Sequence, residues 1–383
     1  METLRVLLTN NTLAARGGTE LYVRDVAVAL KERGHHPVAY STVLGEVAQE
    51  IRDAGLEVIN NLAALPFAPD VIHGHHHLET ITALLHFPQT PAIAYCHGIL
   101  PWEETPLKFP RILRYLAVSN ACRDHLLEHG IAASRAQVLL NFVDLQRFRP
   151  RPPLPPRPTR ALVFCNVACE ANYLGIVREA CQRAGLDCAV LGKNSGRPHP
   201  HPEEVLPQYD LVFAKGRAAI EAMAVGAAVI TCGGEGLGSL VTTANFQAFR
   251  DLNFGLKTFK NPFEPEAILK EIKQYNADDA QEVSRRMRLA ANREDAVDRL
   301  LMIYREVIQE YSQMAPEWTA EEKAAAAYLW WVSPRIKEYE YLQDLRFRVT
   351  NLEDEKRNLL NSKSWRLTRP LRQMKKLLSV FQK

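Results

Sequence analysis

The sequence predicts two Rossmann-like α/β domains followed by a helical C-terminal extension. Three observations lead to this prediction: apolar runs alternate with amphipathic helical patterns in two blocks, a proline-rich stretch divides the blocks, and the end of the chain has helical patterns only. Strands that alternate with helices form a parallel sheet covered on both faces. The length of 383 residues fits two domains and a tail.

The first block, residues 1–150, is predicted to be the N-terminal Rossmann-like domain. LRVLLT begins it as a strand, and ELYVRDVAVALKERG follows as an amphipathic helix that ends at Gly34. The alternation then continues through HPVAYST, EVAQEIRDAG, LEVIN, DVIHGH, ETITALLHF, AIAYCHG, LRYLAVSN, ACRDHLLEHG and AQVLLN.

A linker and a second domain come next. Residues 151–160 are rich in proline, which favours extended geometry, so we interpret them as a semi-rigid linker rather than an SH3-type ligand. Residues 161–315 are predicted to form the second Rossmann-like domain. Its strand patterns are RALVFCNV, DCAVLG, YDLVFA and AAVITCGG, and only helices are expected after these.

The extension, residues 316–383, is predicted to be helical. Leu345, Val349, Leu352 and Leu359 have heptad-like spacing, which favours a short coiled coil, with self-association through it, or a helix lying on the body. Residues 362–383 have many Lys and Arg and no acidic residue. They read as a basic amphipathic helix, with Leu371, Met374, Leu378 and Phe381 on one face, that lies on an anionic membrane or docks on protein.

Composition excludes several classes of function. A formal net charge of +3 is too small to indicate a nucleic-acid-binding surface. The seven cysteines are odd in number and lie mostly in apolar runs, which is typical of reduced thiols in the cytoplasm. No stretch resembles a signal peptide or a membrane span. We therefore expect a cytoplasmic protein, with peripheral contact to the inner face of the membrane through its tail.

Ligands of open α/β sheets bind at the carboxyl ends of the strands. Gly17 and Gly18 follow the first strand and allow the backbone to approach a ligand, although a loop can need two glycines for its own turn. Their spacing does not fit a dinucleotide fingerprint. His97 follows another strand, where an imidazole can bond a substrate hydroxyl or move a proton. A purely structural histidine is the alternative.

Further candidates lie in two other segments. His73, His75, His76 and His77 end the preceding strand and are expected to line the same cleft; no acidic or cysteine residue joins them at metal-ligand spacing.

The second domain contributes the segment FAKGRAAIEAMAVGAAVI, residues 213–230. Lys215, Gly216 and Arg217 form a turn before a helix, where cations and free N–H groups suit a phosphate. Glu221 is expected in the first helical turn, where it either binds a ribose diol or complements the helix dipole.

These pieces together resemble the GT-B glycosyltransferases of the retaining family-4 type (glycosyl transferases group 1). The matching motifs are GGTELYVRDVAVALKERGHHPVAYST, DVIHGHHH, AYCHG, AVSNACRDHLLEHGI, VLLNFVDLQRFRP and IEAMAVGAAVI. The resemblance covers about residues 4–256 and implies two Rossmann-like domains facing a cleft. It also implies that Gly17 and Gly18 approach the donor, that His97 lies by the transferred sugar and that Glu221 holds the donor ribose. No metal or other cofactor is implied.

The donor site departs from the family pattern. Phe213 stands where the family has a first glutamate, and CNVACEANYLG has neither the Arg nor the Lys that contact the pyrophosphate in the family. The loop in ITCGGEGLG also differs from the family's Gly-Gly-x-x-Glu. We expect Lys215 and Arg217 to replace the missing cations.

The resemblance implies a retaining, hexosyltransferase-like enzyme. It would move a sugar from a nucleotide-sugar to a hydroxyl of a glycan or lipid-linked acceptor, with His97 and Glu221 as catalytic residues and His73, His75 and His97 in the acceptor cleft. The segment Ser362–Arg372 is similar to the end of various glycosyltransferases of bacterial polysaccharide assembly. The alternatives are a non-catalytic GT-B scaffold that binds nucleotide or glycan and, less favoured, a sugar-nucleotide epimerase.

Overall fold

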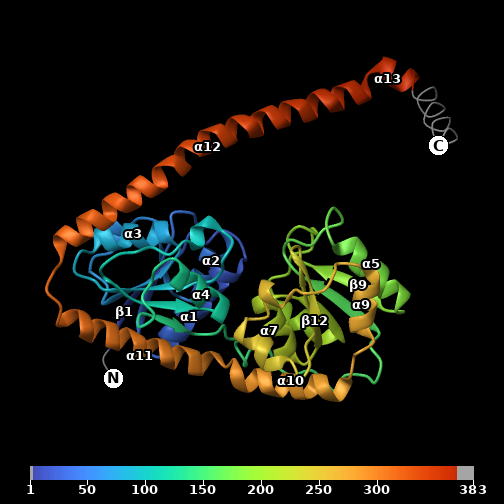
Figure 1. Cartoon of the computed structure of the whole chain (residues 1–383), viewed down its shortest axis with the longest axis horizontal. Helices are drawn as coiled ribbons and strands as arrows, with labels where there is room; N and C mark the ends of the chain where they lie inside the picture. Colours follow the sequence, from blue (N-terminus) through green and yellow to red (C-terminus); the bar gives the residue numbers. More distant parts are fainter. Residues whose placement is uncertain (1–2, 369–383) are drawn as a thin grey trace. The chain divides into compact units, whose positions relative to one another are not determined.

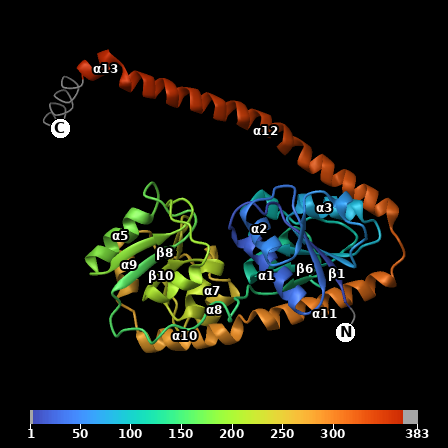
Figure 2. The same ribbon diagram turned by 180° about the vertical axis from the view of Figure 1, so that it is seen from behind.

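The computed structural model describes residues 3–368, apart from the side chains of residues 339, 340 and 366. The chain forms two compact units, residues 1–317 and residues 318–383. The first unit contains two α/β domains, which appear in blue to teal and in green to yellow in Figures 1 and 2. The predicted fold class is confirmed.

The N-terminal domain is built on a seven-stranded sheet in the order β3-β2-β1-β4-β5-β6-β7. Each neighbouring pair is parallel, so the strands end at one edge of the sheet. The strands are β1 (Arg5–Thr9), β2 (His36–Tyr40), β3 (Glu57–Ile59), β4 (Val71–His75), β5 (Ala92–Cys96), β6 (Ile112–Ala117) and β7 (Ala136–Val138).

Helices cover this sheet because their apolar side chains recur at helical spacing. Helix α1 (Gly18–Glu32) buries Val23, Val26, Ala27 and Leu30. The Ser119 hydroxyl caps α4 (Asn120–Glu128) by accepting the Cys122 N–H at 3.1 Å. The remaining helices are α2 (Glu46–Asp53), α3 (His77–His86) and the 3₁₀ turns η1 (Leu62–Ala64) and η2 (Trp102–Glu104).

The second domain has a five-stranded sheet in the order β12-β11-β10-β8-β9. Its strands are β8 (Arg160–Phe164), β9 (Asp187–Leu191), β10 (Leu211–Ala214), β11 (Ala228–Gly233) and β12 (Gly236–Leu240). Strand β12 is antiparallel to β11, so the expectation that no strand follows residue 234 is wrong. Its sequence GLGSL lacks the apolar run by which the other strands are recognised, yet Leu237 and Leu240 are buried.

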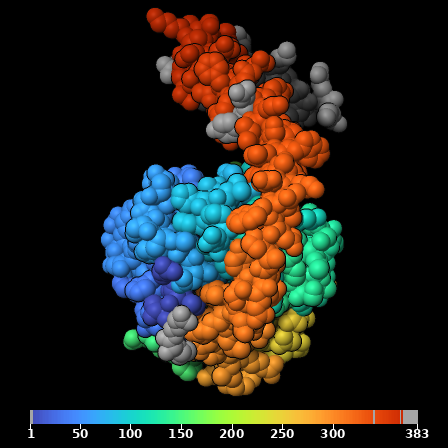
Figure 3. Space-filling model, turned by 90° about the vertical axis from the view of Figure 1, so that its left-hand side faces the viewer, coloured from blue at the N-terminus to red at the C-terminus, as the bar shows by residue number. Residues whose placement is uncertain are grey.

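Helices α5 (Leu174–Arg183) to α10 (Ala277–Ala290) surround the second sheet, and α11 (Arg293–Ser312) returns to the first domain. The others are α6 (Pro202–Val205), η3 (Leu206–Gln208), α7 (Gly216–Val225), α8 (Phe246–Asp251), η4 (Leu256–Thr258) and α9 (Pro265–Ile272). Figure 1 shows α10 running under the second domain and α11 continuing under the first. Helix α11 contacts α1 and strands β4, β5 and β6 of the first domain, whose blue surface is seen in Figure 3.

Two segments that join the domains are fixed by contacts. Although the sequence placed α11 within the second domain, its Tyr304 hydroxyl lies 2.6 Å from Nδ1 of His73 in the first. The proline-rich linker is anchored on the second domain. The Arg151 N–H donates to the Val225 carbonyl, and its guanidinium pairs with Asp210 at 3.0 Å.

The described part of the second unit consists of the 44-residue helix α12 (Trp318–Asn361) and the short α13 (Lys363–Leu367). Within residues 3–368, no helix combines the length and apolar character needed to cross a bilayer. The apolar face predicted for the basic tail, Leu371 to Phe381, lies outside the described residues.

Candidate functional site

A cleft of about 550 Å³ lies between the two domains of the first unit. The beginnings of three helices border it: α1 with Gly18 and Thr19, α4 with Ala121 and Cys122, and α7 with residues 216–218. Helix N-termini expose N–H groups that have no partner within the helix, and they favour negative charge. Of the predicted site residues, this cleft brings together Gly18, His97, Lys215, Gly216 and Arg217.

The two glycines of the first loop have different surroundings. A Cβ atom on Gly17 would collide with the carboxyl group of Glu20, so Gly17 leaves room for a side chain of the protein itself. A Cβ atom on Gly18 would have no atom within 4 Å, and Gly18 borders the cleft. Only Gly18 is therefore free to approach a ligand closely.

His97 borders the cleft at the end of β5, and two more histidines lie behind it. Its Nε2 atom lies 2.7 Å from Nδ1 of His75, and the His75 ring stacks on His73 with centroids 4.4 Å apart. His73 and His75 are fully buried and do not reach the cleft. Aromatic rings of Tyr22 and Tyr95 pack around this histidine column, defined as His73, His75 and His97.

Burial keeps the histidine column neutral. It lowers the pKa of His73 to about 3 and lowers the pKa values of His75 and His97 well below the ordinary range. The Nε2 atoms of His73 and His75 have no hydrogen-bond partner. A neutral imidazole has one donor and one acceptor nitrogen. Because His75 and His97 share a hydrogen bond, the tautomer of His75 determines which nitrogen of His97 carries the proton.

Glu104 is a buried carboxyl group beside His97 that the sequence did not single out. Its Oε2 accepts the His97 backbone N–H at 2.9 Å, and the residue borders the cleft. Burial raises the pKa of Glu104 to about 8, although the hydrogen bond from His97 works in the opposite direction. Glu104 is therefore mostly protonated at neutral pH and shares the neutral character of the histidine column.

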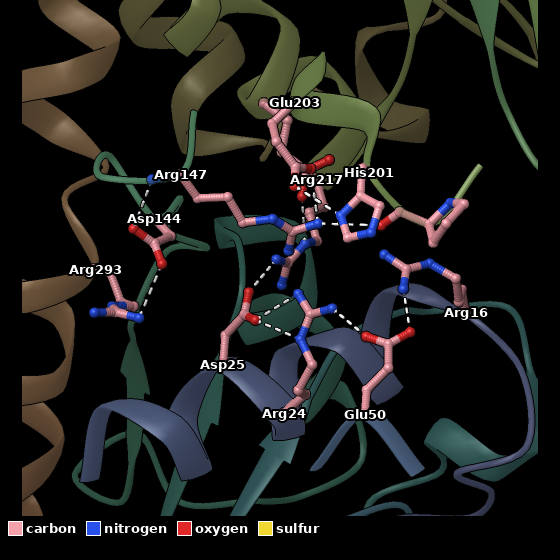
Figure 4. Close-up of polar contacts among 12 residues, drawn as sticks. Arg16, Arg24, Asp25, Glu50, Asp144, Arg147, His201, Glu203, Arg217 and Arg293 are labelled. Atoms are coloured by element: carbon pink, nitrogen blue, oxygen red, sulfur yellow. Dashed lines mark hydrogen bonds and ion pairs between the residues drawn. The ribbon is translucent and has the colours of Figure 1, made fainter. Parts of the chain in front are cut away.

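An ion-pair network, defined as Arg217, Glu221, Asp25, Arg24 and Glu50, crosses from the second domain to the first. Figure 4 shows Arg217, Asp25, Arg24 and Glu50. Arg217 of α7 donates to Glu221 at 2.7 Å and to Asp25 of α1. Arg24 donates to Asp25 at 2.6 Å and to Glu50 at 2.5 Å. Burial alone would raise the pKa of Asp25, but the charges of Arg217 and Arg24 outweigh it and hold this pKa well below its ordinary value.

Glu221 therefore differs from its predicted surroundings. It lies in the second turn of α7, not the first, because the helix begins at Gly216. Its carboxylate accepts from Arg217 four residues earlier and does not border the cleft. Arg217 borders the cleft but has two carboxylate partners, so less of its charge is available to a phosphate than the sequence suggested.

Other polar groups occupy the second domain's side of the cleft. Lys215 pairs with Glu235 of the GGEG loop at 2.6 Å, and Lys257 borders the cleft with an exposed side chain. Asn253 lies beside Gly216 and has a buried Oδ1 without a hydrogen-bond partner. Gly216 itself has φ +54°, a conformation that favours glycine. Lys257 and Asn253 were not predicted, since neither belongs to a recognisable motif.

The end of β8 brings no cation to the cleft. Cys165, Asn166 and Val167 border it there, and Phe213, at the position of the family's first glutamate, is fully buried on β10. Residues 3–368 contain no group of three or more side chains suited to a metal ion.

Comparisons with known proteins agree with this architecture. Residues 16–147 match the family model Glycosyltransferase Family 4. No curated protein sequence matches the chain. A glycosyltransferase from Rickettsia africae is 17% identical with a TM-score of 0.58, over 80% of this chain and 99% of that one.

Two further solved structures have the same fold. HepE of Anabaena, in complex with UDP and glucose, is 14% identical with a TM-score of 0.56, over 78% of this chain and 99% of HepE. Sucrose-phosphate synthase of Thermosynechococcus elongatus is 12% identical with a TM-score of 0.54, over 80% of this chain and all of that one. The expected GT-B fold is confirmed, and the resemblance to family 4 is confirmed for residues 16–147.

Proposed function

We propose that this GT-B, family-4-like protein transfers a sugar from a nucleotide-sugar to a hydroxyl of a glycan or lipid-linked acceptor. The observation that carries the proposal is the cleft, in which the N-terminus of α7 and two lysines of the second domain face His97 of the first. The likeness to HepE supports a nucleotide-sugar donor, because HepE was solved with UDP and with UDP-glucose.

The donor diphosphate would lie at the N-terminus of α7. Residues 216–218 border the cleft there, Lys257 supplies positive charge, and Lys215 can add to it by leaving its ion pair with Glu235. Catalysis at such a site depends on positioning and on stabilising the charge of the departing diphosphate. The side-chain oxygen of Asn253, which has no hydrogen-bond partner, could accept a hydrogen bond from a ribose hydroxyl, the role that the resemblance implied for Glu221.

His97 would act on the transferred sugar or the acceptor hydroxyl. As a neutral imidazole it can donate or accept one hydrogen bond. We keep the expectation that a hexose is transferred with retention, which NMR of the product's anomeric proton would test; inversion would contradict it.

The donor site is tested by calorimetric titration of UDP, GDP and ADP into the wild type and Gly18→Ala. The methyl group meets no protein atom, so stability should stay within about 0.5 kcal/mol while nucleotide affinity falls roughly tenfold or more. Gly175→Ala is the matched control, because it too meets no atom within 4 Å and lies outside the cleft. Equal affinities for both variants and the wild type would reject the close approach at Gly18.

A non-catalytic scaffold is the second candidate, and the pairing of Glu221 with Arg217 favours it. The two functions separate in one assay: donor consumption in the presence of glycan and lipid-linked acceptors. Nucleotide binding without transfer to any acceptor would support the scaffold. Donor conversion without an acceptor would instead indicate an epimerase.

We also propose a cytoplasmic enzyme of bacterial surface polysaccharide assembly that touches the inner face of the membrane through residues 362–383. The basic composition of this segment supports membrane contact. Co-sedimentation with anionic liposomes should be lost on deleting residues 362–383, and unchanged co-sedimentation would exclude this contact.

A further inference from the structure

Helix α12 carries an exposed apolar stripe, defined as Leu342, Leu345, Val349, Leu352 and Leu359. These side chains are between 36% and 63% exposed. Their spacing of three and four residues places them at the a and d positions of a heptad repeat, and Lys356 occupies the one a position between Leu352 and Leu359. Such a stripe on a single long helix is normally covered by another helix.

The charges beside the stripe indicate which helix covers it. Arg346 and Arg348 flank the first half of the stripe at e and g positions, and Glu353 and Glu355 flank the second half. Arg348 pairs with Asp344 of its own helix at 2.8 Å. Arg346, Glu353 and Glu355 have no ion pair among residues 3–368. The residues that flank the stripe are therefore positive along its first half and negative along its second half. A second copy of the helix that runs in the opposite direction would place positive flanking residues against negative ones.

The two orientations of a self-pair differ at the charged positions. In an antiparallel pair centred between Val349 and Leu352, flanking contacts join e to e and g to g. Arg346 then faces Glu353 of the second copy, and Arg348 faces Glu355. Every pair occurs twice because of the two-fold axis.

A parallel pair joins g to the following e instead, so Arg348 would face Glu353 while Arg346 and Glu355 would have no charged partner. It would also set Lys356 against Lys356 in the core, whereas the antiparallel pair sets Lys356 against Leu345. Like charges at one core layer are unfavourable, which again favours the antiparallel orientation.

We infer that α12 pairs with α12 of a second copy of this chain as an antiparallel coiled coil, through Leu342, Leu345, Val349, Leu352 and Leu359. The association does not depend on the proposed transferase activity, and it can be measured without substrate.

Analytical ultracentrifugation of the full chain tests the pairing. The wild type should reach a monomer–dimer equilibrium or a dimer. Val349→Asp, beside the two-fold axis, should weaken dimerisation roughly a hundredfold, because each dimer would bury two new charges. Phe347→Asp is the matched control: Phe347 is 65% exposed at the outer f position, so this variant should change dimerisation less than about threefold. A monomeric wild type at the highest soluble concentration would overturn the proposal, and the stripe would then belong to another partner.

Charge exchange tests the orientation with variants of identical composition. Arg348→Glu should weaken the dimer about tenfold, since it creates two repulsive contacts. Adding Glu355→Arg should restore wild-type dimerisation in the antiparallel arrangement. Adding Glu353→Arg should restore it only in the parallel one. All three variants lose the ion pair between Arg348 and Asp344, so this loss does not contribute to the differences among them. Restoration by Glu353→Arg but not by Glu355→Arg would overturn the antiparallel pairing.

Discussion

Two kinds of side chain are buried beside the cleft. Charged groups are buried where the two domains meet, and neutral groups are buried behind His97 in the N-terminal domain. The ion-pair network keeps Asp25 and Arg217 ionised because each lies against an opposite charge. The histidine column and Glu104 are buried as well, but they do not each have a buried partner of opposite charge, and they stay neutral. Burial is common to both regions, so the presence of partners decides the charge state.

The difference also separates two roles. A paired network is costly to break, which suits an element that fixes two domains relative to each other. A neutral imidazole can donate or accept a hydrogen bond to a ligand without an ionic partner having to be broken, which suits a group that contacts substrate. On this basis the network belongs to the architecture of the cleft and His97 to its chemistry.

The largest expected effect is on stability, from Arg217→Met. The variant leaves Glu221 without its partner and Asp25 with only Arg24, so we expect a loss of about 3–5 kcal/mol in the free energy of unfolding. Urea denaturation followed by circular dichroism would measure it. Adding Glu221→Leu should recover part of the loss, because it removes the unpaired carboxylate.

Arg147→Met is the matched control for this experiment. Arg147 also joins a carboxylate of the second domain, Glu203 at 2.8 Å, but its side chain is partly exposed. We expect a loss of at most about 1 kcal/mol. Equal losses for Arg147→Met and Arg217→Met would mean that burial does not distinguish the two ion pairs, and the contrast between paired and neutral regions would lose its energetic basis.

The next effect, on the order of 2–3 kcal/mol between pH 6 and 8, concerns the pH dependence of stability through Glu104. Its pKa is raised from 4.5 to about 8, so the folded state retains a proton that the unfolded state releases. The stability contributed by this group is complete below pH 4.5 and falls as the pH rises toward 8. Glu104→Gln cannot ionise and should flatten the thermal-stability profile between pH 6 and 8.

Glu103→Gln is the adjacent control for the pH experiment, because Glu103 is partly exposed and is not bonded to the His97 backbone. Its profile should follow the wild type. If the pH dependence of stability seen in the wild type persists in Glu104→Gln, Glu104 is ionised in the folded protein. It would then belong with the buried charged groups and not with the neutral ones.

Most of the architecture could be predicted from the sequence because strand and helix periods differ. Runs such as RVLLT and AIAYC mark β1 and β5. Two residues singled out in the sequence because they directly follow strands, His97 and Lys215, border the cleft. Strand β12 was missed, since GLGSL has no apolar run and is held by its pairing with β11.

The partners of the site residues could not be predicted, because they depend on contacts between distant segments. Asp25 occupies a position in α1 that reads as one polar residue in an amphipathic pattern, and only the approach of α7 gives it Arg217. Glu104 follows His97 by seven residues, and the turn η2 brings its carboxyl group back to the His97 N–H. A motif places a residue along the chain, but burial and partners are set by the fold.

The smallest effect, about five- to tenfold in kcat, tests whether the neutral histidine column acts on His97 through hydrogen bonding. His75→Phe removes the 2.7 Å bond to His97 and keeps a ring of similar shape, so on the proposed transferase activity kcat should fall by that factor while KM stays unchanged. His75→Asn can place an amide near the position of Nδ1 and should recover most of the rate. Equal losses in both variants would assign His75 a packing role, since only a hydrogen bond that orients His97 distinguishes asparagine from phenylalanine here.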